Sequence, residues 1–506
     1  MRIFFASLFV LALPAVTFAL DSAPKGERSV KVFQTSREGD RLTPVVPRAD
    51  IKSDRILQVD LSQTHQTLIG IGSSFTEAAA AALSELSDEV RAEVLESYFS
   101  PEGAHISLTR THVASCDFSL RNYTYAPVAG DTELAHFSIE PDRTYLLPLI
   151  KDAQKVEGAD FKILASPWTA PPWMKNNGTW NGGELKPEFY GTFANYLVKY
   201  VQAYEKEGIP IWGLTPMNEP LGNDANWEST HFDAEQMRSL IADHLGPALA
   251  KAEPEVGLWI YDQNREDHML KWAEVIYGDK KASSFVRGMA VHWYQSTVDV
   301  GAEWLDKVHT QFPEKEIIHS EGCIDAMGND EVIGSWMEDD WYWRPEAADW
   351  GFRWAAEDKK KDHPRYRPFY RYTRDLIQGL NHSLSGWIDW NLALNTRGGP
   401  NHARNFCLAP ILVEAGQNRV YRTPLFYSIA HVSKFIRPGA KRVGLSGQEE
   451  KFMATAFHNP DNSVAVVVFN ASESAGNYSV KVDGMTVELE IKAGALQTVL
   501  LSPQGD

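Results

Sequence analysis

The chain has 506 residues, 43% hydrophobic and 11% aromatic, so it can bury a large core, and a mainly disordered chain is excluded. There are 49 basic and 67 acidic residues, a formal net charge of −18 at pH 7. A surface this acidic repels phosphate backbones, which argues against a nucleic-acid partner. Three cysteines (Cys116, Cys323 and Cys407) are too few and too scattered for a disulfide framework or a cysteine-rich zinc site.

The first residues are typical of a targeting segment. Arg2 precedes an almost wholly apolar run at 3–13, and Thr17 and Ala19 place small residues where a cleavage site after Ala19 requires them. A core helix or a membrane anchor is the alternative, but the run is too short to span a bilayer, and no later stretch approaches that length. We therefore predict a signal peptide at 1–19 and a secreted or periplasmic protein.

Eight short apolar runs typical of buried strands follow in order. They lie at 68–71, 106–111, 161–165, 211–215, 256–261, 288–293, 316–319 and 384–390. Stretches with helical character lie between them, such as 77–98, 188–207, 234–251 and 366–380. This alternation predicts an α/β fold, a (β/α)₈ TIM barrel. The alternative is a doubly wound open sheet, but Gly70-Ile71-Gly72 lacks the third glycine of the phosphate-binding fingerprint.

The end of the chain has a different pattern. Short strand-like runs at 452–457, 463–470, 478–482 and 486–491 are separated by Asn, Pro and Gly turns. Such spacing predicts an antiparallel all-β sandwich, and the strand-like segment 30–61 is expected to complete it. The predicted organisation is a signal peptide at 1–19, sandwich strands at 20–65, a catalytic barrel at 66–430 and the main part of the sandwich at 431–506.

Two glutamates follow predicted strands at equivalent places. Glu219 lies just after the fourth run, beside the amide of Asn218, and Glu321 follows the seventh run. The chemistry of a (β/α)₈ barrel takes place on the loops after its strands, and strands four and seven lie on roughly opposite sides of the ring. Glycoside hydrolysis needs two carboxyl groups flanking the scissile bond. Either glutamate alone fits a solvated loop residue, but the two together predict a glycosidase pair.

The segments Thr215–Pro220 and Ser320-Glu321 resemble the acid/base and nucleophile motifs of glycoside hydrolase family 30, the glucosylceramidase family. The resemblance runs from Leu68 to the C-terminus, and it implies a (β/α)₈ barrel with a β-sandwich. It includes the segments 114–119, 165–169, 290–294, 386–392, 399–401 and 433–440.

The resemblance also implies roles for single residues. Glu219 would be the acid/base and Glu321 the nucleophile of a retaining enzyme, whose carboxyl groups lie about 5–5.5 Å apart. Tyr294 would form a hydrogen bond near the nucleophile. The alternative for the tryptophans of the implied sugar site is packing at the top of the barrel, since Trp is mostly buried. The residues implied to contact the glycosyl unit are Asp117, Trp168, Asn218, Trp390 and Asn405.

No metal or cofactor is expected. The sequence has no His-Glu-x-x-His pair and no cluster of cysteine and histidine, and His292 lies in an apolar run. It also lacks a Gly-x-Ser-x-Gly elbow and a Walker A loop. Cys116 and Cys323 flank the predicted catalytic residues, but a carboxylate mechanism needs no thiol, so we interpret them as small buried residues.

One segment, 325–367, departs from the pattern of animal glucosylceramidases because it is longer and rich in aromatic and acidic residues. It follows the seventh strand, so we expect it to lie over the rim of the site. Trp341 and Trp343 would then form a stacking platform for a sugar chain or a greasy rim for a ceramide; the alternative is a self-packed aromatic lid. The residues concerned are Trp336, Glu338, Asp339, Asp340, Trp341, Tyr342, Trp343, Trp350 and Trp354.

With the predicted signal peptide, the resemblance implies a secreted retaining β-glucosidase of the glucosylceramidase type, which cleaves glucosylceramide to glucose and ceramide. A β-1,6-glucanase or β-1,6-glucosidase is the alternative within the family. A catalytically inactive carbohydrate-binding protein is the alternative from another class. The aglycone, the pH optimum and the oligomeric state stay open.

Overall fold

The computed structural model describes residues 28–503 except 223–226, 254, 326–333, 345–356 and 359. The predicted signal peptide at 1–19, together with Trp350 and Trp354, lies outside the described residues.

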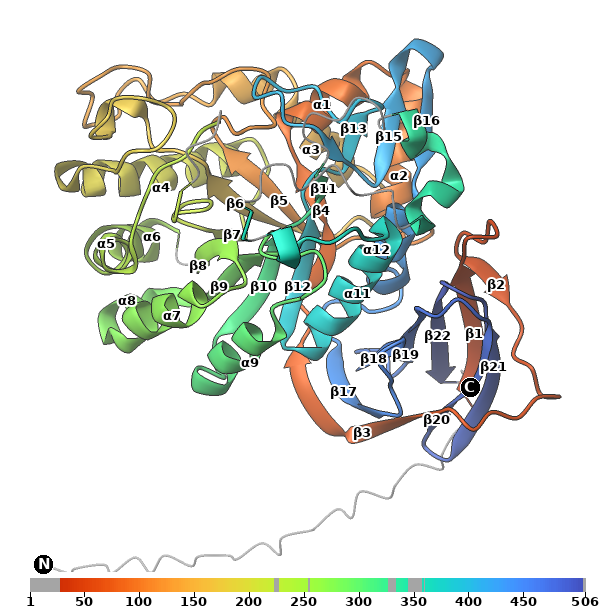
Figure 1. Cartoon of the computed structure of the whole chain (residues 1–506). Helices are drawn as coiled ribbons and strands as arrows, with labels where there is room; N and C mark the ends of the chain where they lie inside the picture. Colours follow the sequence, from red (N-terminus) through yellow and green to blue (C-terminus); the bar gives the residue numbers. More distant parts are fainter. Residues whose placement is uncertain are drawn as a thin grey trace, which may run out of the picture.

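Eight parallel strands form a closed barrel in the order β10-β12-β4-β5-β6-β7-β8-β9 (Figure 1). Each strand corresponds to one predicted run, which confirms the (β/α)₈ barrel; the alternative of an open doubly wound sheet is wrong. The strands are β4 (Gly70–Phe75), β5 (Leu108–Val113), β6 (Lys162–Pro167), β7 (Gly213–Leu214), β8 (Gly257–Asn264), β9 (Val286–His292), β10 (Glu316–Glu321) and β12 (Leu384–Asp389).

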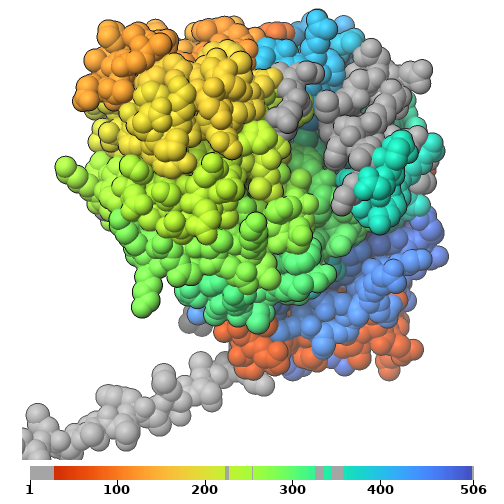
Figure 2. All heavy atoms as spheres, turned by 60° about the vertical axis from the view of Figure 1, so that its left-hand side comes forward, coloured from red at the N-terminus to blue at the C-terminus, as the bar shows by residue number. Residues whose placement is uncertain are grey.

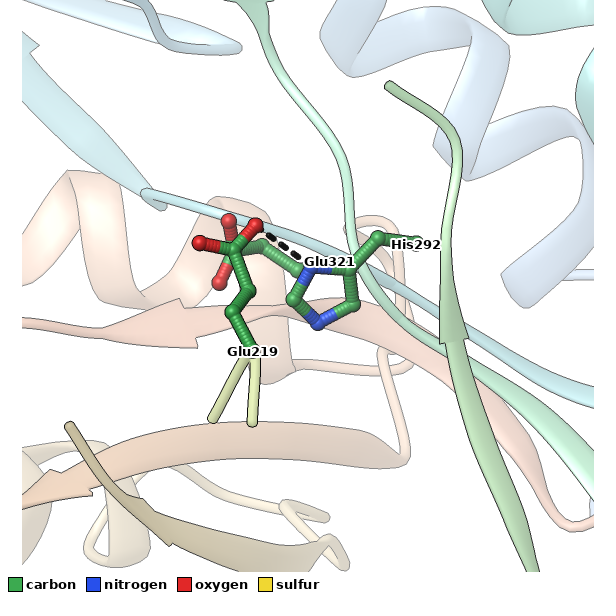
Figure 3. Close-up of side chains that lie close together, drawn as sticks. All are labelled: Glu219, His292 and Glu321. Atoms are coloured by element: carbon green, nitrogen blue, oxygen red, sulfur yellow. Dashed lines mark ion pairs between the residues drawn. The ribbon is translucent and has the colours of Figure 1, made fainter. Parts of the chain in front are cut away.

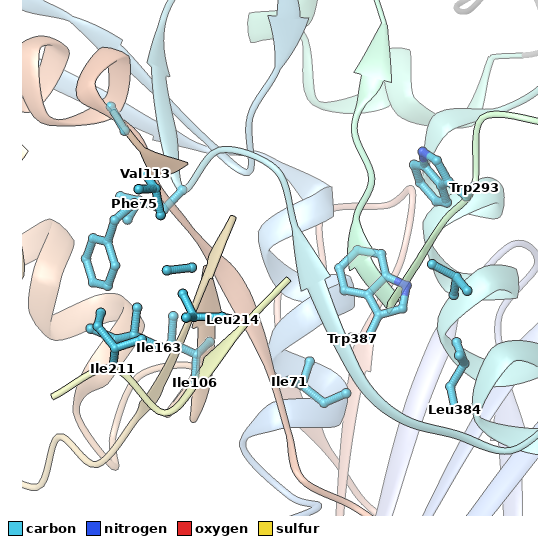
Figure 4. Packing of buried hydrophobic residues seen from close by; sticks show 14 of the residues in the cluster. Ile71, Phe75, Ile106, Val113, Ile163, Ile211, Leu214, Trp293, Leu384 and Trp387 are labelled. Atoms are coloured by element: carbon cyan, nitrogen blue, oxygen red, sulfur yellow. The ribbon is translucent and has the colours of Figure 1, made fainter. Parts of the chain in front are cut away.

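Helices surround the barrel and cover the outward side chains of its strands. Ile71 and Ile163, for example, pack in one large cluster with helical residues such as Tyr196 and Leu376, part of which Figure 4 shows. The helices are α1 (Glu77–Ser84), α2 (Asp88–Phe99), α3 (Leu146–Gln154), α4 (Tyr190–Lys206), α5 (Ala234–Leu240), α6 (Gly246–Ala252), α7 (His268–Gly278), α8 (Lys280–Phe285), α9 (Ala302–Gln311), α11 (Pro368–Asn381) and α12 (Pro424–Ser433).

The interior of the barrel has an apolar layer below a polar layer. Side chains two positions apart on a strand point to the same side. In four strands the inward apolar residue is followed, two positions later, by an inward polar one: Leu108 by Arg110 and Leu164 by Ser166, and on the opposite side Ala290 by His292 and Ile318 by Ser320. The apolar layer consists of Ile69, Leu108, Leu164, Trp259, Ala290, Ile318 and Ile388.

Trp259 fills the centre of the apolar layer because the neighbouring strands carry glycine. A Cβ atom on Gly213 would lie 2.4 Å from the Trp259 ring, and one on Gly288 would lie 3.0 Å from its Nε1 atom and 2.1 Å from the Glu316 carbonyl oxygen. These distances leave no space for a side chain. The barrel is thus closed below the polar layer, which can be reached only from the ends of the strands where Glu219 and Glu321 lie.

Strands from both ends of the chain form the second part of the molecule. A nine-stranded sheet has the order β2-β1-β22-β19-β18-β17-β3-β20-β21 and folds over on itself as a sandwich. The Tyr478 hydroxyl of one layer donates to Gln497 Oε1 of the other at 2.6 Å. Figure 2 shows atoms of the early strands, in red, beside atoms from late in the chain, in blue. The strands are β1 (Arg28–Thr35), β2 (Thr43–Val45), β3 (Ile56–Thr67), β17 (Lys441–Ser446), β18 (Phe452–His458), β19 (Val464–Asn470), β20 (Gly476–Val482), β21 (Met485–Ile491) and β22 (Leu496–Pro503).

Two small sheets lie in the segments after the last barrel strands. β11 (Ile324–Asp325), just beyond the predicted nucleophile, pairs with β14 (Cys407–Leu408) in antiparallel fashion. β15 (Ile411–Glu414) pairs with both β13 (Ala393–Asn395) and β16 (Arg419–Arg422). Both sheets connect the segment that carries Asn405 to the body of the barrel.

Trp341 and Trp343, two described residues of the aromatic segment, are buried against the protein. Trp341 and Trp343 are only 3% and 4% exposed. Trp343 donates its Nε1 hydrogen to the Gly494 carbonyl at 2.8 Å, and its ring lies 4.5 Å from that of Phe369. A platform built from these two residues is therefore a wrong prediction, since a stacking surface must be exposed. Trp343 instead joins α11 to the sandwich.

None of the helices described above is both long and apolar enough to cross a membrane.

Replacing Trp343 with Ala should destabilise the fold, because it removes a buried ring between α11 and the sandwich. We expect the free energy of unfolding to fall by about 3 kcal/mol or more, as is usual when a buried Trp is truncated to Ala. Trp343→Phe keeps a ring against Phe369 and loses the hydrogen bond to Gly494, so its loss should be about 1 kcal/mol. Urea unfolding measures both. An unchanged transition in W343A would mean that this ring does not support the interface.

Candidate active site

Glu219 and Glu321 meet at the mouth of the barrel. Glu219 follows β7, the fourth strand of the barrel in chain order, and Glu321 ends β10, the seventh. One carboxylate oxygen of each, together with a ring nitrogen of His292, lie within 4.8 Å of one another (Figure 3). Glu321 is buried, and the side chain of Glu219 is 18% exposed. The more accessible carboxyl is thus the one predicted to exchange protons.

The predicted nucleophile is held by two donors. Arg110 Nη1 donates to Glu321 Oε2 at 2.6 Å, and the Tyr294 hydroxyl donates to Oε1 at 3.0 Å. Burial raises the pKa of Glu321 above its usual range; His292 and Arg110 oppose this shift, and Glu219 adds to it. Both donors favour the carboxylate form, and they fix its orientation at the end of β10.

Asp262 is the centre of a buried hydrogen-bond network. Its carboxylate, on β8, accepts hydrogen bonds at 2.6–3.0 Å from five side chains. Burial opposes the ionisation of Asp262, but Arg110 and His292 outweigh it and hold its pKa well below the usual range. The donors lie on or just after strands β5, β6, β7, β9 and β10; they are Arg110, Ser166, Thr215, His292 and Ser320.

His292 connects this network to the predicted acid/base. Its Nε2 atom lies 3.0 Å from Asp262 Oδ1, and its Nδ1 atom lies 3.4 Å from Glu219 Oε1. Burial opposes a charge on the ring, but Glu321, Asp262 and Glu219 outweigh it and raise the pKa of His292 to about 9. At neutral pH the ring is therefore a cation between Asp262 and the predicted acid/base Glu219.

The backbone is strained at Glu219 and at Asp262. Glu219, Tyr261 and Asp262 have φ angles of 45°, 79° and 47°, in the left-handed region that residues with a side chain rarely adopt. The backbone amide of Glu219 donates a hydrogen bond to the backbone carbonyl of Asp262 at 2.9 Å, so this bond connects the two strained segments. Such conformations gather at functional sites, where the surrounding structure enforces them.

One wall of the site has polar atoms with no protein partner. Asn405 Nδ2 donates to Asp117 Oδ2 at 2.9 Å. The other oxygens, Asp117 Oδ1 and Asn405 Oδ1, are buried and form no hydrogen bond with the protein. Burial, followed by the charge of Glu321, raises the pKa of Asp117 well above its usual range. Buried polar atoms need partners, and the hydroxyl groups of a sugar would supply them.

Trp168 and Trp390 pack against each other. Their rings are 4.9 Å apart and nearly parallel, and the Arg110 guanidinium lies 4.7 Å from the centre of the Trp168 ring. The two tryptophans therefore pack at the top of the barrel, which was the alternative to a role in sugar binding. Contact of either ring with a sugar stays a prediction. Asn218, the remaining predicted residue, accepts from Arg110 Nη2 at 2.7 Å through its side-chain oxygen, so it shares a donor with Glu321 and Asp262.

Sequence reasoning missed most of the network beneath the two glutamates. It counted Arg110 and His292 within apolar strand runs and gave neither a role. The available signal was an inward-facing polar residue two positions after an apolar one, repeated in several strands of the barrel. The missed residues are Arg110, Ser166, Thr215, Asp262, His292 and Ser320.

Glu219, His292 and Glu321 are also the described residues of this site that could hold a metal ion, with donor atoms within 4.8 Å of one another. Both carboxylates and the ring already have charged partners, however. Arg110 binds Glu321, and His292 lies between Asp262 and Glu219. Each carboxylate is therefore already paired with a cationic side chain, an arrangement suited to proton transfer and nucleophilic attack.

The charge of His292 should make the stability depend on pH. Its pKa is raised from about 6.5 to about 9 on folding, so the protonated ring stabilises the fold fully below pH 6.5, and this contribution is lost as the pH rises through 9. His292→Gln should lower the free energy of unfolding by on the order of 3 kcal/mol at pH 6.5 and by much less above pH 9.

Urea unfolding of the wild type and H292Q across this pH range measures the difference. H136Q, at an exposed histidine paired with Asp131, is the matched control and should follow the wild-type profile. Parallel profiles for H292Q and the wild type would show that the ring carries no such charge.

Comparison with known proteins agrees with the fold. The model of the glycosyl hydrolase family 30 TIM-barrel domain matches residues 68–343 and 347–436, and that of the family 30 β-sandwich domain matches 439–499. The chain is 35% identical to the lysosomal acid glucosylceramidase of Mus musculus over 483 residues, covering 92% of this chain and 85% of the relative.

Two further likenesses extend the comparison. An endo-1,6-β-D-glucanase of Aspergillus fumigatus is 27% identical, covering 81% of this chain and 80% of the relative. The crystal structure of SrfJ from Salmonella typhimurium superimposes with a TM-score of 0.81 at 27% identity, covering 93% of this chain and 99% of that one. Because the family models match nearly all of the barrel and the sandwich, the chain belongs to glycoside hydrolase family 30.

Proposed function

We propose that the protein is a retaining β-glucosidase that works by a two-carboxylate double displacement. The observation that carries this proposal is the approach of Glu219 and Glu321, whose nearest oxygens lie within 4.8 Å. Retaining enzymes have carboxyl groups about 5–5.5 Å apart, whereas inverting enzymes need about 6.5–9.5 Å to admit a water molecule between carboxyl and sugar. The short separation supports direct attack by a carboxylate.

In the first step Glu321 attacks the anomeric carbon, and the bond from that carbon to the leaving oxygen breaks. Glu219 gives its proton to the leaving oxygen, so the aglycone departs as an alcohol and a glucosyl-enzyme ester remains. In the second step Glu219 takes a proton from water, whose oxygen attacks the same carbon and releases Glu321 as a carboxylate. Two inversions give net retention.

The surroundings of the two glutamates suit these roles. Arg110 and Tyr294 hold Glu321 by hydrogen bonds to both of its oxygens, which keeps the attacking carboxylate in one orientation. The cationic ring of His292 stabilises negative charge on Glu219 after it has donated its proton. The partnerless oxygens of Asp117 and Asn405 would accept hydrogen bonds from sugar hydroxyls.

The proposed substrate is a glucosylceramide, cleaved to glucose and ceramide. The support is the likeness to the mouse glucosylceramidase, which covers 92% of this chain. A β-1,6-linked glucan is the second candidate because the chain is also 27% identical to a fungal endo-1,6-β-D-glucanase. Export of the enzyme remains part of the proposal and is supported only by the sequence pattern of residues 1–19.

The two glutamates should respond differently to substitution. Glu321→Gln should lower kcat by a factor of about 10⁴ or more on every glucoside, because no glucosyl-enzyme forms. Glu219→Gln should lose about 10²–10⁴-fold on substrates with poor leaving groups but keep turning over aryl glucosides that need little protonation. Added azide should accelerate E219Q and yield a glucosyl azide, since azide attacks the intermediate without a base.

The matched control is Glu316→Gln, at the other end of the same strand, where the carboxylate pairs with Arg287. It should retain wild-type activity. Formation of the β-glucosyl azide by E321Q instead of E219Q would reverse the two assignments, since only attack on a glucosyl-enzyme gives the β anomer.

Substrate choice can be tested by measuring kcat/KM side by side on an aryl β-glucoside, on glucosylceramide dispersed in detergent and on a β-1,6-glucan. We expect turnover of the aryl glucoside and the glucosylceramide. Cleavage of the glucan without the lipid would favour the second candidate. If the folded wild type turned over none of the three substrates, the proposed enzymatic activity would be contradicted, and a carbohydrate-binding protein would be favoured.

A further inference from the structure

Two cysteines that lie far apart in the sequence meet beside the proposed nucleophile. The sulfur atoms of Cys323 and Cys407 are 3.1 Å apart, although 84 positions separate the residues. Both side chains are buried. Cys323 lies two residues after Glu321, and Cys407 lies two residues after Asn405, so the pair joins the segments that carry these two site residues.

The pairing of β11 with β14 explains why the two sulfurs meet. Asp325 lies opposite Cys407, and Ile324 lies opposite Leu408. Cys323 lies two positions before the residue paired with Cys407, so it is the diagonal neighbour of Cys407 across the pair. The sulfurs need to move only about 1 Å closer to reach the 2.05 Å of a covalent bond.

We propose that Cys323 and Cys407 are a disulfide-forming site. A small disulfide such as oxidised glutathione supplies the oxidising equivalents. One thiolate attacks a sulfur of that disulfide and expels one glutathione thiolate, and the second cysteine thiolate then attacks the mixed disulfide and expels the other. Two protein thiols and one small disulfide thus become one protein disulfide and two small thiols.

The exchange takes place before the segment closes. Buried thiols react slowly with reagents in solution, and both sulfurs are covered once β11 and β14 have paired. The small disulfide therefore reacts with the folding chain, and closure of the pair brings the second sulfur into place. An oxidising compartment, which the proposed export would provide, supplies these conditions.

The disulfide would hold the mouth of the site together. It links the end of β10, where Glu321 lies, to the segment whose Asn405 donates to Asp117. A link between residues so far apart in sequence restricts the unfolded chain strongly, so the oxidised form should resist heat better than the reduced form. This inference concerns the two sulfurs alone and does not depend on which glycoside is cleaved.

Cys116 provides an internal reference. Its sulfur lies 3.8 Å from Ser119 Oγ, in the loop after β5. The chain has three cysteines, so the proposal leaves one thiol, that of Cys116, in the oxidised protein.

The test counts thiols in the full chain. The protein is refolded in a mixture of oxidised and reduced glutathione, then unfolded in guanidinium chloride and labelled with N-ethylmaleimide, and the labels are counted by intact mass. We expect one label in this sample and three after prior reduction, with a peptide map that links Cys323 to Cys407. Three labels without reduction, or a link that involves Cys116 or a second chain, would overturn the proposal.

Cysteine variants provide a second test of which thiols form the disulfide. Cys116→Ser should carry no label after oxidative refolding, and Cys407→Ser should carry two. If C407S fails to fold, Cys407→Val, which replaces the thiol with a small apolar side chain, gives the same count. Reduction should lower the thermal midpoint of the wild type and of C116S by several degrees and leave C407V unchanged. Equal shifts in all three would show that the reductant acts elsewhere.

Discussion

The carboxylate of Asp262 is the feature on which the arrangement of the site depends. It collects hydrogen bonds from five neighbouring strands or their ends in a region without exposed surface. Burying a single charge is costly, but here Arg110 and His292 balance Asp262 and Glu321, so the group carries no net charge before Glu219 is counted. Such a network fixes positions more than it adds stability, because each member loses its partners if another moves.

The two layers inside the barrel divide stability from chemistry. The lower layer is apolar and filled by Trp259, and it seals the barrel. The upper layer consists of polar residues at the next inward positions of the same strands. The hydrogen-bond network therefore lies directly on the packed apolar layer, and solvent reaches it only through the mouth of the barrel. Charged groups on such a base are already oriented before a substrate arrives, which is the condition for strong electrostatic catalysis.

The sequence was sufficient for the barrel and the two glutamates but not for the partners that position them. Strand runs and the residues that follow them are local patterns, so Glu219 and Glu321 could be placed at the ends of the fourth and seventh strands. The contacts of Arg110 with Glu321 and Asp262 span 211 and 152 positions, and no local pattern encodes them. The prediction of a platform at Trp341 and Trp343 was wrong for the same reason. Trp343 donates to the carbonyl of Gly494, which lies 151 positions away, and no local pattern shows that contact.

The sandwich formed from both ends of the chain has a consequence for biosynthesis. β1 forms a ladder with β22, the last strand, over Arg28–Thr35 and Leu496–Pro503, and β3 pairs with β17 and β20. A ribosome releases β1 and β3 long before these partners exist, so their hydrogen-bonding edges stay open while the whole barrel is being made. Open strand edges recruit other chains. Nascent chains of this protein are therefore exposed to strand-edge aggregation until translation ends.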